Sequence, residues 1–312
     1  MRTIELTYPH TLTMNELPET AAAIGFFDGI HRGHQKVIKT AVSEARSRGM
    51  ESAVITFHPH PSVVLKKDVQ HVQYITPLKE KQEVLQQLDV DRLYIITFNK
   101  ELSSLLPQQF IDHFIIGLNI KHLVAGFDYS FGFKGEGNMN NMAEYTRGEF
   151  TFTTIEKVEL DDEKVSSTKI RKLLKAGDVE GVKTLLARPL TVSGIVIEGD
   201  KRGKKLGYPT ANIQLNRDAL LPKPGIYAVK VIVKNESYEG MASLGTNPTF
   251  TANRKDLSLE VNIFDYKNDL YGEVLQMEWC KFIRDEIKFD STEALIDQIA
   301  NDEKLIRNYF SS

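Results

Sequence analysis

The segment Gly25-Phe26-Phe27-Asp28-Gly29-Ile30-His31-Arg32-Gly33-His34 decides the fold of the first half of this chain. Residues 21–27, which run into the start of this segment, are apolar. After the segment, residues 35–48 space apolar side chains as an amphipathic helix does. The two histidines therefore stand at a strand-to-helix junction. The first turn of a helix leaves backbone N–H groups unpaired and carries the positive end of the dipole, so it favours an anion. The segment predicts a phosphate site.

The residue types in this segment suit phosphate chemistry. At positions i and i+3, the imidazoles of His31 and His34 lie on one helix face and can donate hydrogen bonds to one phosphate group. Gly25, Gly29 and Gly33 let a phosphate approach the main chain. One alternative is a helix cap with surface histidines. A metal site is less favoured, because no third ligand at metal-site spacing accompanies the pair.

A second segment, Val165-Ser166-Ser167-Thr168-Lys169-Ile170-Arg171, opens another helical pattern. Three hydroxyls at a helix start are ordinary caps in most proteins, and that alternative stays open. Capping does not call for the lysine and arginine that follow. Hydroxyls, free amides and two cations together form a clamp for a triphosphate, because a guanidinium can hold two oxygens at once.

The chain changes texture near Arg188-Pro189. Residues 1 to about 186 alternate strand-like segments (22–27, 52–57, 92–98, 122–127, 150–158) with helix-like ones (33–48, 77–88, 107–118, 167–175), which predicts a parallel α/β sheet. Ligands of such sheets bind beyond the carboxyl ends of the strands. Short β-rich runs follow (190–197, 226–233, 238–244, 257–264, 274–283), and they predict an antiparallel barrel closed by a helix over residues 292–310. We expect two domains, residues 1–186 and 187–312.

The glycine- and asparagine-rich stretch from Gly132 to Met142 lacks periodicity and is interpreted as a mobile loop, either a lid or a plain surface loop.

Bulk composition points to a small-molecule substrate. With 39 basic and 42 acidic side chains, the net charge of −3 attracts neither nucleic acid nor an anionic membrane. The single cysteine, Cys280, is interpreted as a buried strand residue. No membrane-length apolar run or signal peptide is apparent, so we expect a cytoplasmic protein.

A third segment, from Gly199 to Asn212, combines glycines, four cationic side chains and a hydroxyl/amide pair. A solvated basic loop is the alternative. Pro209 fixes the backbone, and Thr210 and Asn212, two apart in an extended segment, project to the same side. Their hydroxyl and amide oxygens suit Mg²⁺, which completes its shell with water and substrate phosphates.

Together the three segments resemble a known family. The pattern of residues 25–34, followed by Ser166 to Arg171, resembles the adenylyltransferase module of bacterial bifunctional riboflavin kinase/FAD synthetases, and Pro209 to Asn212 resembles its riboflavin kinase module. The segments 56–61, 126–132, 245–250 and 283–290 also look like this family. The resemblance covers about residues 15 to 308. It departs from the family at Phe127, where many members carry an acidic residue, and at Asp285, where many carry proline.

The resemblance implies roles for residues. In the adenylyltransferase, the implied ATP contacts are Gly25, Phe27, Asp28, His31, His34, Asp128, Ser166, Ser167, Thr168 and Arg171. In the kinase, they are Gly199, Lys201, Gly203, Lys205, Gly207, Pro209 and Thr210. Implied flavin contacts are His58, Pro59, Pro61, Asn247, Phe250 and Arg284. Thr210 and Asn212 would hold Mg²⁺, and Glu260 would be the general base of the kinase, with His31 and His34 as the catalytic pair of the adenylyltransferase.

The expected function is therefore two-step flavin cofactor synthesis. ATP phosphorylates riboflavin to FMN in the second half, and FMN then attacks a second ATP in the first half, which gives FAD and pyrophosphate. Three alternatives remain: a chain that keeps one activity, a cytidylyltransferase acting on another phosphate acceptor, and a flavin-binding regulator without turnover. We expect riboflavin, FMN and ATP as partners, with no nucleic acid or membrane, and the sequence does not reveal the oligomeric state.

Overall fold

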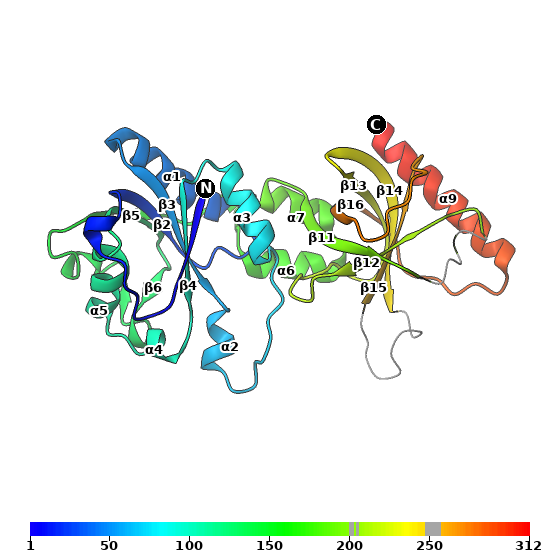
Figure 1. Ribbon diagram of the computed structural model, residues 1–312. Coiled ribbons are helices and arrows are strands. Elements are labelled where there is room, and N and C mark those ends of the chain that lie inside the picture. Colours follow the sequence, from blue (N-terminus) through cyan, green and yellow to red (C-terminus); the bar gives the residue numbers. More distant parts are fainter. Residues whose placement is uncertain (200–202, 204–205, 247–256) are drawn as a thin grey trace. The chain divides into compact units, whose positions relative to one another are not determined.

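The computed structural model describes residues 1–199, 203, 206–246 and 257–312. It divides the chain into two compact units (Figure 1). The first contains residues 1–72 and 77–166, and the second contains residues 73–76 and 167–312. Among the described residues, no helix has the length and apolar character needed to cross a bilayer.

The first unit is built on a six-stranded parallel sheet in the order β1-β4-β3-β2-β5-β8. Its strands are β1 (Arg2–Leu6), β2 (Thr20–Ile24), β3 (Glu51–His58), β4 (Arg92–Thr97), β5 (Ile120–Gly126) and β8 (Thr151–Ile155). The chain runs from β2 to β3 and β4 on one side, and β5 pairs with β2 on the other. The carboxyl ends of β3, β2 and β5 are therefore neighbours at the point where strand order reverses, where ligands of such sheets bind.

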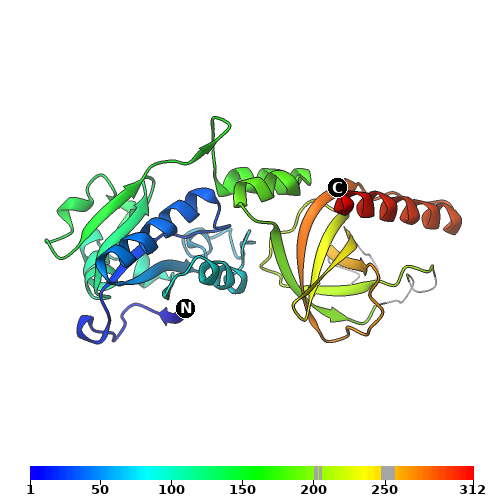
Figure 2. The same cartoon turned by 90° about the horizontal axis from the view of Figure 1, so that it is seen from above.

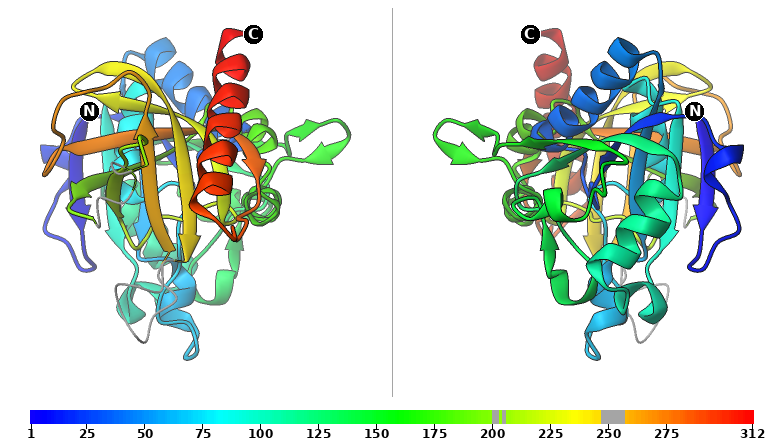
Figure 3. Two further views of the ribbon diagram at one scale, coloured as in Figure 1. Left: turned by 90° about the vertical axis from the view of Figure 1, so that its right-hand side faces the viewer. Right: turned by 90° about the vertical axis from the view of Figure 1, so that its left-hand side faces the viewer.

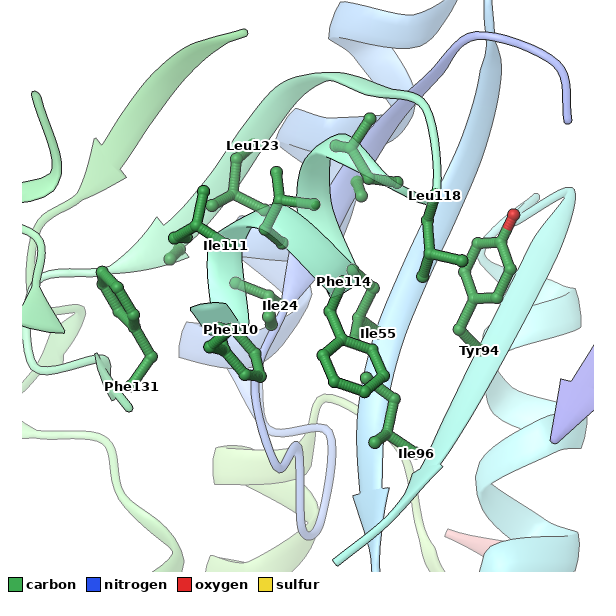
Figure 4. Close-up of a cluster of buried hydrophobic side chains, with 14 of the residues drawn as sticks. Ile24, Ile55, Tyr94, Ile96, Phe110, Ile111, Phe114, Leu118, Leu123 and Phe131 are labelled. Carbon is green, nitrogen blue, oxygen red and sulfur yellow. The ribbon is translucent and has the colours of Figure 1, made fainter. Parts of the chain in front are cut away.

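Helices cover both faces of this sheet. On one face, α1 (Arg32–Arg48) and α3 (Leu78–Gln87) bury apolar side chains against the central strands. On the other, α5 (Pro107–Ile111) and the π-helical turn Asp112–Ile116 pack Phe110 and Phe114 against Ile24, Ile55 and Ile96 (Figure 4). The remaining short elements are η1 (Met14–Glu16), α2 (Pro61–Leu65), α4 (Lys100–Ser103), β6 (Ser130–Phe131), η3 (Phe133–Gly135), β7 (Gly137–Asn138), η4 (Met142–Glu144), β9 (Glu159–Leu160) and β10 (Glu163–Lys164).

The second unit is a closed antiparallel barrel in the order β11-β12-β15-β14-β13-β16. Its strands are β11 (Leu190–Ile197), β12 (Ala211–Leu215), β13 (Gly225–Val233), β14 (Glu236–Thr246), β15 (Leu257–Ile263) and β16 (Val274–Arg284). Helix α6 (Ser167–Ala176) precedes α7 (Val179–Leu186), which packs against β11 and β16. The last helix, α9 (Thr292–Ser311), lies along the outside of the barrel against β14 and β16 (Figures 2 and 3).

The predicted fold class is confirmed for both halves, and Cys280 is buried in β16 as predicted. Residues 132–142, for which a mobile loop is predicted, either a lid or a plain surface loop, do not form a plain surface loop. This stretch carries β7, η3 and the start of η4, and it buries Met139 and Met142 in the core of the first unit. Its side chains pack at irregular intervals, which hides the core contacts from a search for periodicity. In the six-stranded sheet and the barrel, β1 and β12 are strands that the sequence analysis does not predict, and the two-residue strands β6, β7, β9 and β10 are also absent from the prediction.

Candidate nucleotide and flavin sites

The histidine segment of the first unit folds into a tight turn between β2 and α1. Phe27 and Ile30 both adopt positive φ angles, of 51° and 43°, and Gly29 has a φ of 88°. Positive φ is costly for residues with a side chain and persists only where the surroundings impose it. Phe27 and Ile30 are buried in the core between α1 and the sheet, which imposes this conformation. His31 follows as the N-cap of α1.

His31 and His34 stack against each other, with ring centroids 3.6 Å apart and 19° between the ring planes. The Nδ1 atom of His31 accepts the backbone N–H of His34 at 3.2 Å. Because Nδ1 is the acceptor, the neutral ring carries its proton on Nε2. Burial lowers the pKa of His31 to about 4 and the pKa of His34 well below its ordinary value. Both rings are therefore neutral at pH 7 and can serve as hydrogen-bond donors without carrying charge.

Two glycines of the segment have a steric reason to lack a side chain. A Cβ on Gly33 would lie 3.1 Å from Cε1 of His31 and would press against the imidazole ring. A Cβ on Gly25 would lie 2.9 Å from Cε1 of Phe27. Phe27 in turn meets the edge of His34, with ring centroids 5.3 Å apart. The glycines thus allow the ring positions of the histidine pair.

Asp128 lies beyond the carboxyl end of β5, on an exposed turn. Its Oδ2 accepts a hydrogen bond from Nζ of Lys164 at 2.8 Å, and the same Nζ lies 4.8 Å from the ring centroid of Phe127. Lys164 belongs to the hairpin of β9 and β10, which projects from the sheet (Figures 2 and 3). The charges of Lys164 and Asp128 both affect the pKa of His31, the first lowering it and the second raising it. Sequence reasoning missed Lys164, since nothing in its local pattern distinguishes it from a surface lysine.

The predicted flavin residues of the first unit surround the end of β3. His58 ends this strand, and Pro61 begins the short helix α2. The ring of His60, the N-cap of α2, lies edge-on to Phe26 with centroids 4.5 Å apart. The segment 58–61 therefore adjoins the turn of the histidine segment.

The second phosphate segment is shared between the two units. Ser166 ends the first unit, whereas Ser167, Thr168 and Arg171 lie on α6 in the second. Within the second unit, Nη2 of Arg171 donates to the carbonyl of Gln73 at 2.8 Å. That these side chains bind the same ATP as the histidine pair stays a prediction.

In the second unit, three of the residues predicted for the kinase lie close together: Thr210, Asn212 and Glu260. Thr210 Oγ1 donates to a carboxylate oxygen of Glu260 at 3.1 Å. Asn212 on β12 is the direct cross-strand partner of Glu260 on β15. Leu259 and Val261 are buried in the barrel, so Glu260 projects from the opposite face of the strand. One hydroxyl, one amide and one carboxylate thus meet where β12 begins.

The backbone around this cluster is tightly packed. A Cβ on Gly199 would lie 2.1 Å from Nδ2 of Asn212, and a Cβ on Gly203 would lie 3.2 Å from Oγ1 of Thr210. Gly207 has a φ of 86°, which favours glycine. Nδ2 of Asn262 donates to the carbonyl of Pro209 at 2.7 Å and so holds the strand entry that carries Thr210. Asn262 is not among the residues predicted for this site from the sequence.

Four of the predicted contact residues lie outside the part of the chain that the structure describes: Lys201, Lys205, Asn247 and Phe250. The guanidinium of Arg284 is held by Asp302 of α9, with Nη2 at 2.7 Å and Nε at 2.9 Å from Oδ2. The side chain of Arg284 thus has a structural partner in this unit, and a contact between Arg284 and flavin stays a prediction.

Comparisons with known proteins agree with this arrangement. A family model described as FAD synthetase matches residues 13–169, and one described as riboflavin kinase matches residues 186–310. A bifunctional riboflavin kinase/FMN adenylyltransferase of Bacillus subtilis (strain 168) is 45% identical over 313 residues, which cover 100% of this chain and 99% of that protein. A protein of the same description from Escherichia coli (strain K12) is 33% identical over 305 residues, 96% of each chain.

Among solved structures, one described as a macrolide-efflux protein from Streptococcus pneumoniae has a TM-score of 0.89 and 34% identity, and the match covers 99% of both chains. Its description differs from those of the sequence relatives and is a statement about that protein alone. The family models cover most of both halves, and the relatives match over their full length. This chain belongs to the family of bifunctional riboflavin kinases/FMN adenylyltransferases.

Proposed function

We propose that the two activities of this family divide between the two sites described above, with FMN adenylylation at the histidine pair and riboflavin phosphorylation at Thr210, Asn212 and Glu260. The proposal is carried by the contrast between the two units. The first contains the stacked, neutral histidine pair, and the second contains the hydrogen bond from Thr210 to Glu260. The proposed functional division lies near residue 186, where the riboflavin kinase model begins, and the FAD synthetase model ends before it at residue 169. We also propose a reducing, cytoplasmic location, given the single buried thiol of Cys280.

In adenylyl transfer, an oxygen of the FMN phosphate attacks the α-phosphorus of ATP, and the bond to pyrophosphate breaks. The attacking phosphate is already an anion, so the step needs no strong base. The Nε2–H group of His31, His34 and the positive N-terminal end of α1 stabilise negative charge on the phosphates. The proposed further ATP contacts are Gly25, Phe27, Asp28, Asp128, Ser166, Ser167, Thr168 and Arg171, with His58, Pro59 and Pro61 on the flavin side.

In riboflavin phosphorylation, the ribityl 5′-hydroxyl attacks the γ-phosphorus of ATP, and ADP leaves. The hydroxyl must lose its proton, and Glu260 accepts it. The hydrogen bond from Thr210 orients the Glu260 carboxylate and leaves its other oxygen for the substrate. Gly199, Gly203, Gly207 and Pro209 are proposed ATP contacts, as are Lys201 and Lys205, and Asn247, Phe250 and Arg284 are proposed flavin contacts.

A hydroxyl, an amide and a carboxylate form an oxygen donor set that fits Mg²⁺, which takes few protein ligands and several waters or phosphates. Thr210 and Asn212 would hold this ion. When bound, Mg²⁺ neutralises charge on the ATP phosphates.

The test separates the activities by substitution in the full-length protein. His31→Ala combined with His34→Ala should lower FAD formation from supplied FMN by about 100-fold or more and leave riboflavin phosphorylation within twofold. Glu260→Ala should lower phosphorylation by roughly 100-fold or more and leave FAD formation from FMN unchanged. Rates are measured by chromatography of FMN and FAD.

Two exposed residues provide matched controls. His71→Ala and Glu293→Ala remove the same side-chain types from the surface of each unit and should leave both rates unchanged. Parallel loss of both activities in either site variant, with circular dichroism unchanged, would contradict the division.

A further inference from the structure

Lys81 of α3 is a buried cation that the reaction described above does not use. Its side chain is only 4% exposed, although lysine is almost never buried in proteins without a partner. It approaches the histidine segment from the neighbouring helix and reaches the turn that follows β2. A charged group in such a position needs compensating contacts within the protein.

Lys81 finds these contacts in the two motifs beside it. Its Nζ donates to the carbonyl of Phe26 at 2.8 Å and lies 3.3 Å from Oγ1 of Thr56. Thr56 Oγ1 also donates to the Phe26 carbonyl, at 3.0 Å. The ammonium group lies 4.9 Å from the centroid of the Phe26 ring, which adds a cation–π contact. One carbonyl therefore receives two donors, from β3 and from α3.

The position of the Phe26 carbonyl matters because a strained turn begins next to it. Phe27 and Ile30 have positive φ angles, and His31 follows as the cap of α1. Relaxation of this turn would move His31 and the first turn of α1. A displacement of about 1 Å from the reacting geometry can cost as much as roughly 100-fold in rate.

Asp28 within the same turn is also buried, at 5% exposed. Its charge favours the protonated form of Lys81, whereas the charge of Lys81 lowers the pKa of His34. The titratable groups that face the ammonium are therefore Asp28 from the turn and His34 from α1. Lys81 compensates the aspartate, and its charge adds to the lowering of the His34 pKa that burial mainly causes.

We propose that Lys81 is a positioning residue for FMN adenylylation, which fixes the turn of residues 26–31 through the Phe26 carbonyl and compensates the buried Asp28. The inference rests on the proposed location of adenylyl transfer at the histidine pair. It assigns a role in the reaction to a residue that makes its contacts with the protein, and the substrate-contacting groups remain His31 and His34.

The primary test is Lys81→Met in the full-length protein, which keeps the length of the side chain and removes its charge. We expect the kcat/KM for FAD formation from FMN to fall roughly 10- to 100-fold, with riboflavin phosphorylation within twofold of wild type. Lys79→Met makes the same chemical change at an exposed position of the same helix and should leave both rates unchanged. A change of less than twofold in FAD formation by Lys81→Met overturns the proposal.

A pH profile distinguishes positioning by charge from simple packing. Burial lowers the pKa of Lys81 to about 8, so the ammonium loses its proton as the pH rises through that value. In wild type, kcat/KM for adenylylation should fall severalfold between about pH 7 and pH 9.5, since kcat/KM reports groups of the free enzyme. Lys81→Met should lack this alkaline decline. Thr56→Val removes the neutral donor to Phe26 and one acceptor of Lys81 but keeps the ammonium group and its bond to the Phe26 carbonyl, so it should keep the decline.

The outcomes separate this inference from the proposed function. If the double histidine variant keeps FAD formation, the location of the reaction is wrong. If that variant is inactive while Lys81→Met is fully active, only the role of Lys81 fails. Should Lys81→Met not fold, a wild-type profile that stays flat to pH 9.5 overturns the inference, and a decline near pH 8 that Thr56→Val retains supports it.

Discussion

The histidine pair of the first unit and the Thr210–Glu260 pair of the second are built on different scaffolds and treat charge differently. His31 caps a helix beyond a parallel sheet, and burial keeps its ring neutral. Glu260 stands on an antiparallel barrel strand beside a threonine hydroxyl. Both sites handle ATP on the proposed division, and in the second the carboxylate of Glu260 accepts a hydrogen bond from the neighbouring hydroxyl of Thr210.

The difference follows from the attacking group in each reaction. The FMN phosphate arrives deprotonated, so neutral donors and helix amides that stabilise charge are enough. The riboflavin hydroxyl must lose a proton as it attacks, so a carboxylate is needed. The comparison teaches that an ATP site is adapted to the protonation state of its acceptor as well as to the nucleotide.

The comparison assumes that the histidine pair and the ATP contacts proposed on α6 keep their geometry when the barrel melts, and the largest expected effect tests this. Asp302, 1% exposed, accepts hydrogen bonds from Arg284 and Gln298 and ties α9 to β16. Asp302→Ala leaves the guanidinium of Arg284 without its carboxylate and should destabilise the second unit by about 3 kcal/mol. Scanning calorimetry should show a lower melting temperature for this unit. Kinase activity should be lost on mild heating before FAD formation from FMN.

Asp297→Ala, an exposed change on the same helix, is the control and should melt as wild type does. If Asp302→Ala shifts the loss of both activities to the same lower temperature, the units unfold together and the comparison of independent sites fails.

A smaller effect tests whether the kinase cluster depends on its backbone support. Asn262 is 8% exposed and holds the carbonyl of Pro209, next to Thr210. Asn262→Ala leaves the Pro209 carbonyl without this hydrogen-bond donor, which should lower the free energy of unfolding by about 1–3 kcal/mol. The strand entry that carries Thr210 is then less firmly held. We expect riboflavin phosphorylation to fall roughly 10-fold, in steady-state kinetics with saturating ATP, and FAD formation from FMN to stay unchanged.

The exposed Asn268→Ala provides the matched control for this change. An Asn262→Ala enzyme with wild-type kinase kinetics would mean that Thr210 and Glu260 keep their geometry without the asparagine.

Much of this arrangement could be predicted from the sequence, because regular patterns mark it. The apolar run before His31 and the helical spacing after it indicated β2 and α1, and the β-rich run over residues 257–264 indicated β15, which carries Glu260. The parallel topology then implied that the motifs after β2, β3 and β5 meet at one edge.

Other features depend on tertiary contacts that leave no local pattern. In the polar sequence Leu78-Lys79-Glu80-Lys81, nothing distinguishes Lys81 from a solvated lysine. Lys81 is buried because α3 approaches the turn after β2. Strand β12 is five residues long and follows a basic segment, so its pairing with β11 and β15 could not be read from composition. Met139 and Met142 are buried by packing without periodicity.

The smallest expected effect concerns the charge state that distinguishes the histidine site. The pKa of His31 is about 4 in the folded protein, below its ordinary value of 6.5, because burial disfavours the imidazolium. Between these values the unfolded chain binds the proton and the folded chain does not, so stability must fall as the pH falls from about 6.5 to 4. At pH 5 the titration of His31 should lower the free energy of unfolding by about 2 kcal/mol relative to pH 7. The side chain of His31→Gln cannot titrate. In urea unfolding, this variant should therefore lose less stability than wild type does when the pH is lowered from 7 to 5. Equal losses in wild type and variant would mean that His31 is charged in the folded protein, and the contrast between a neutral donor site and a carboxylate site would disappear.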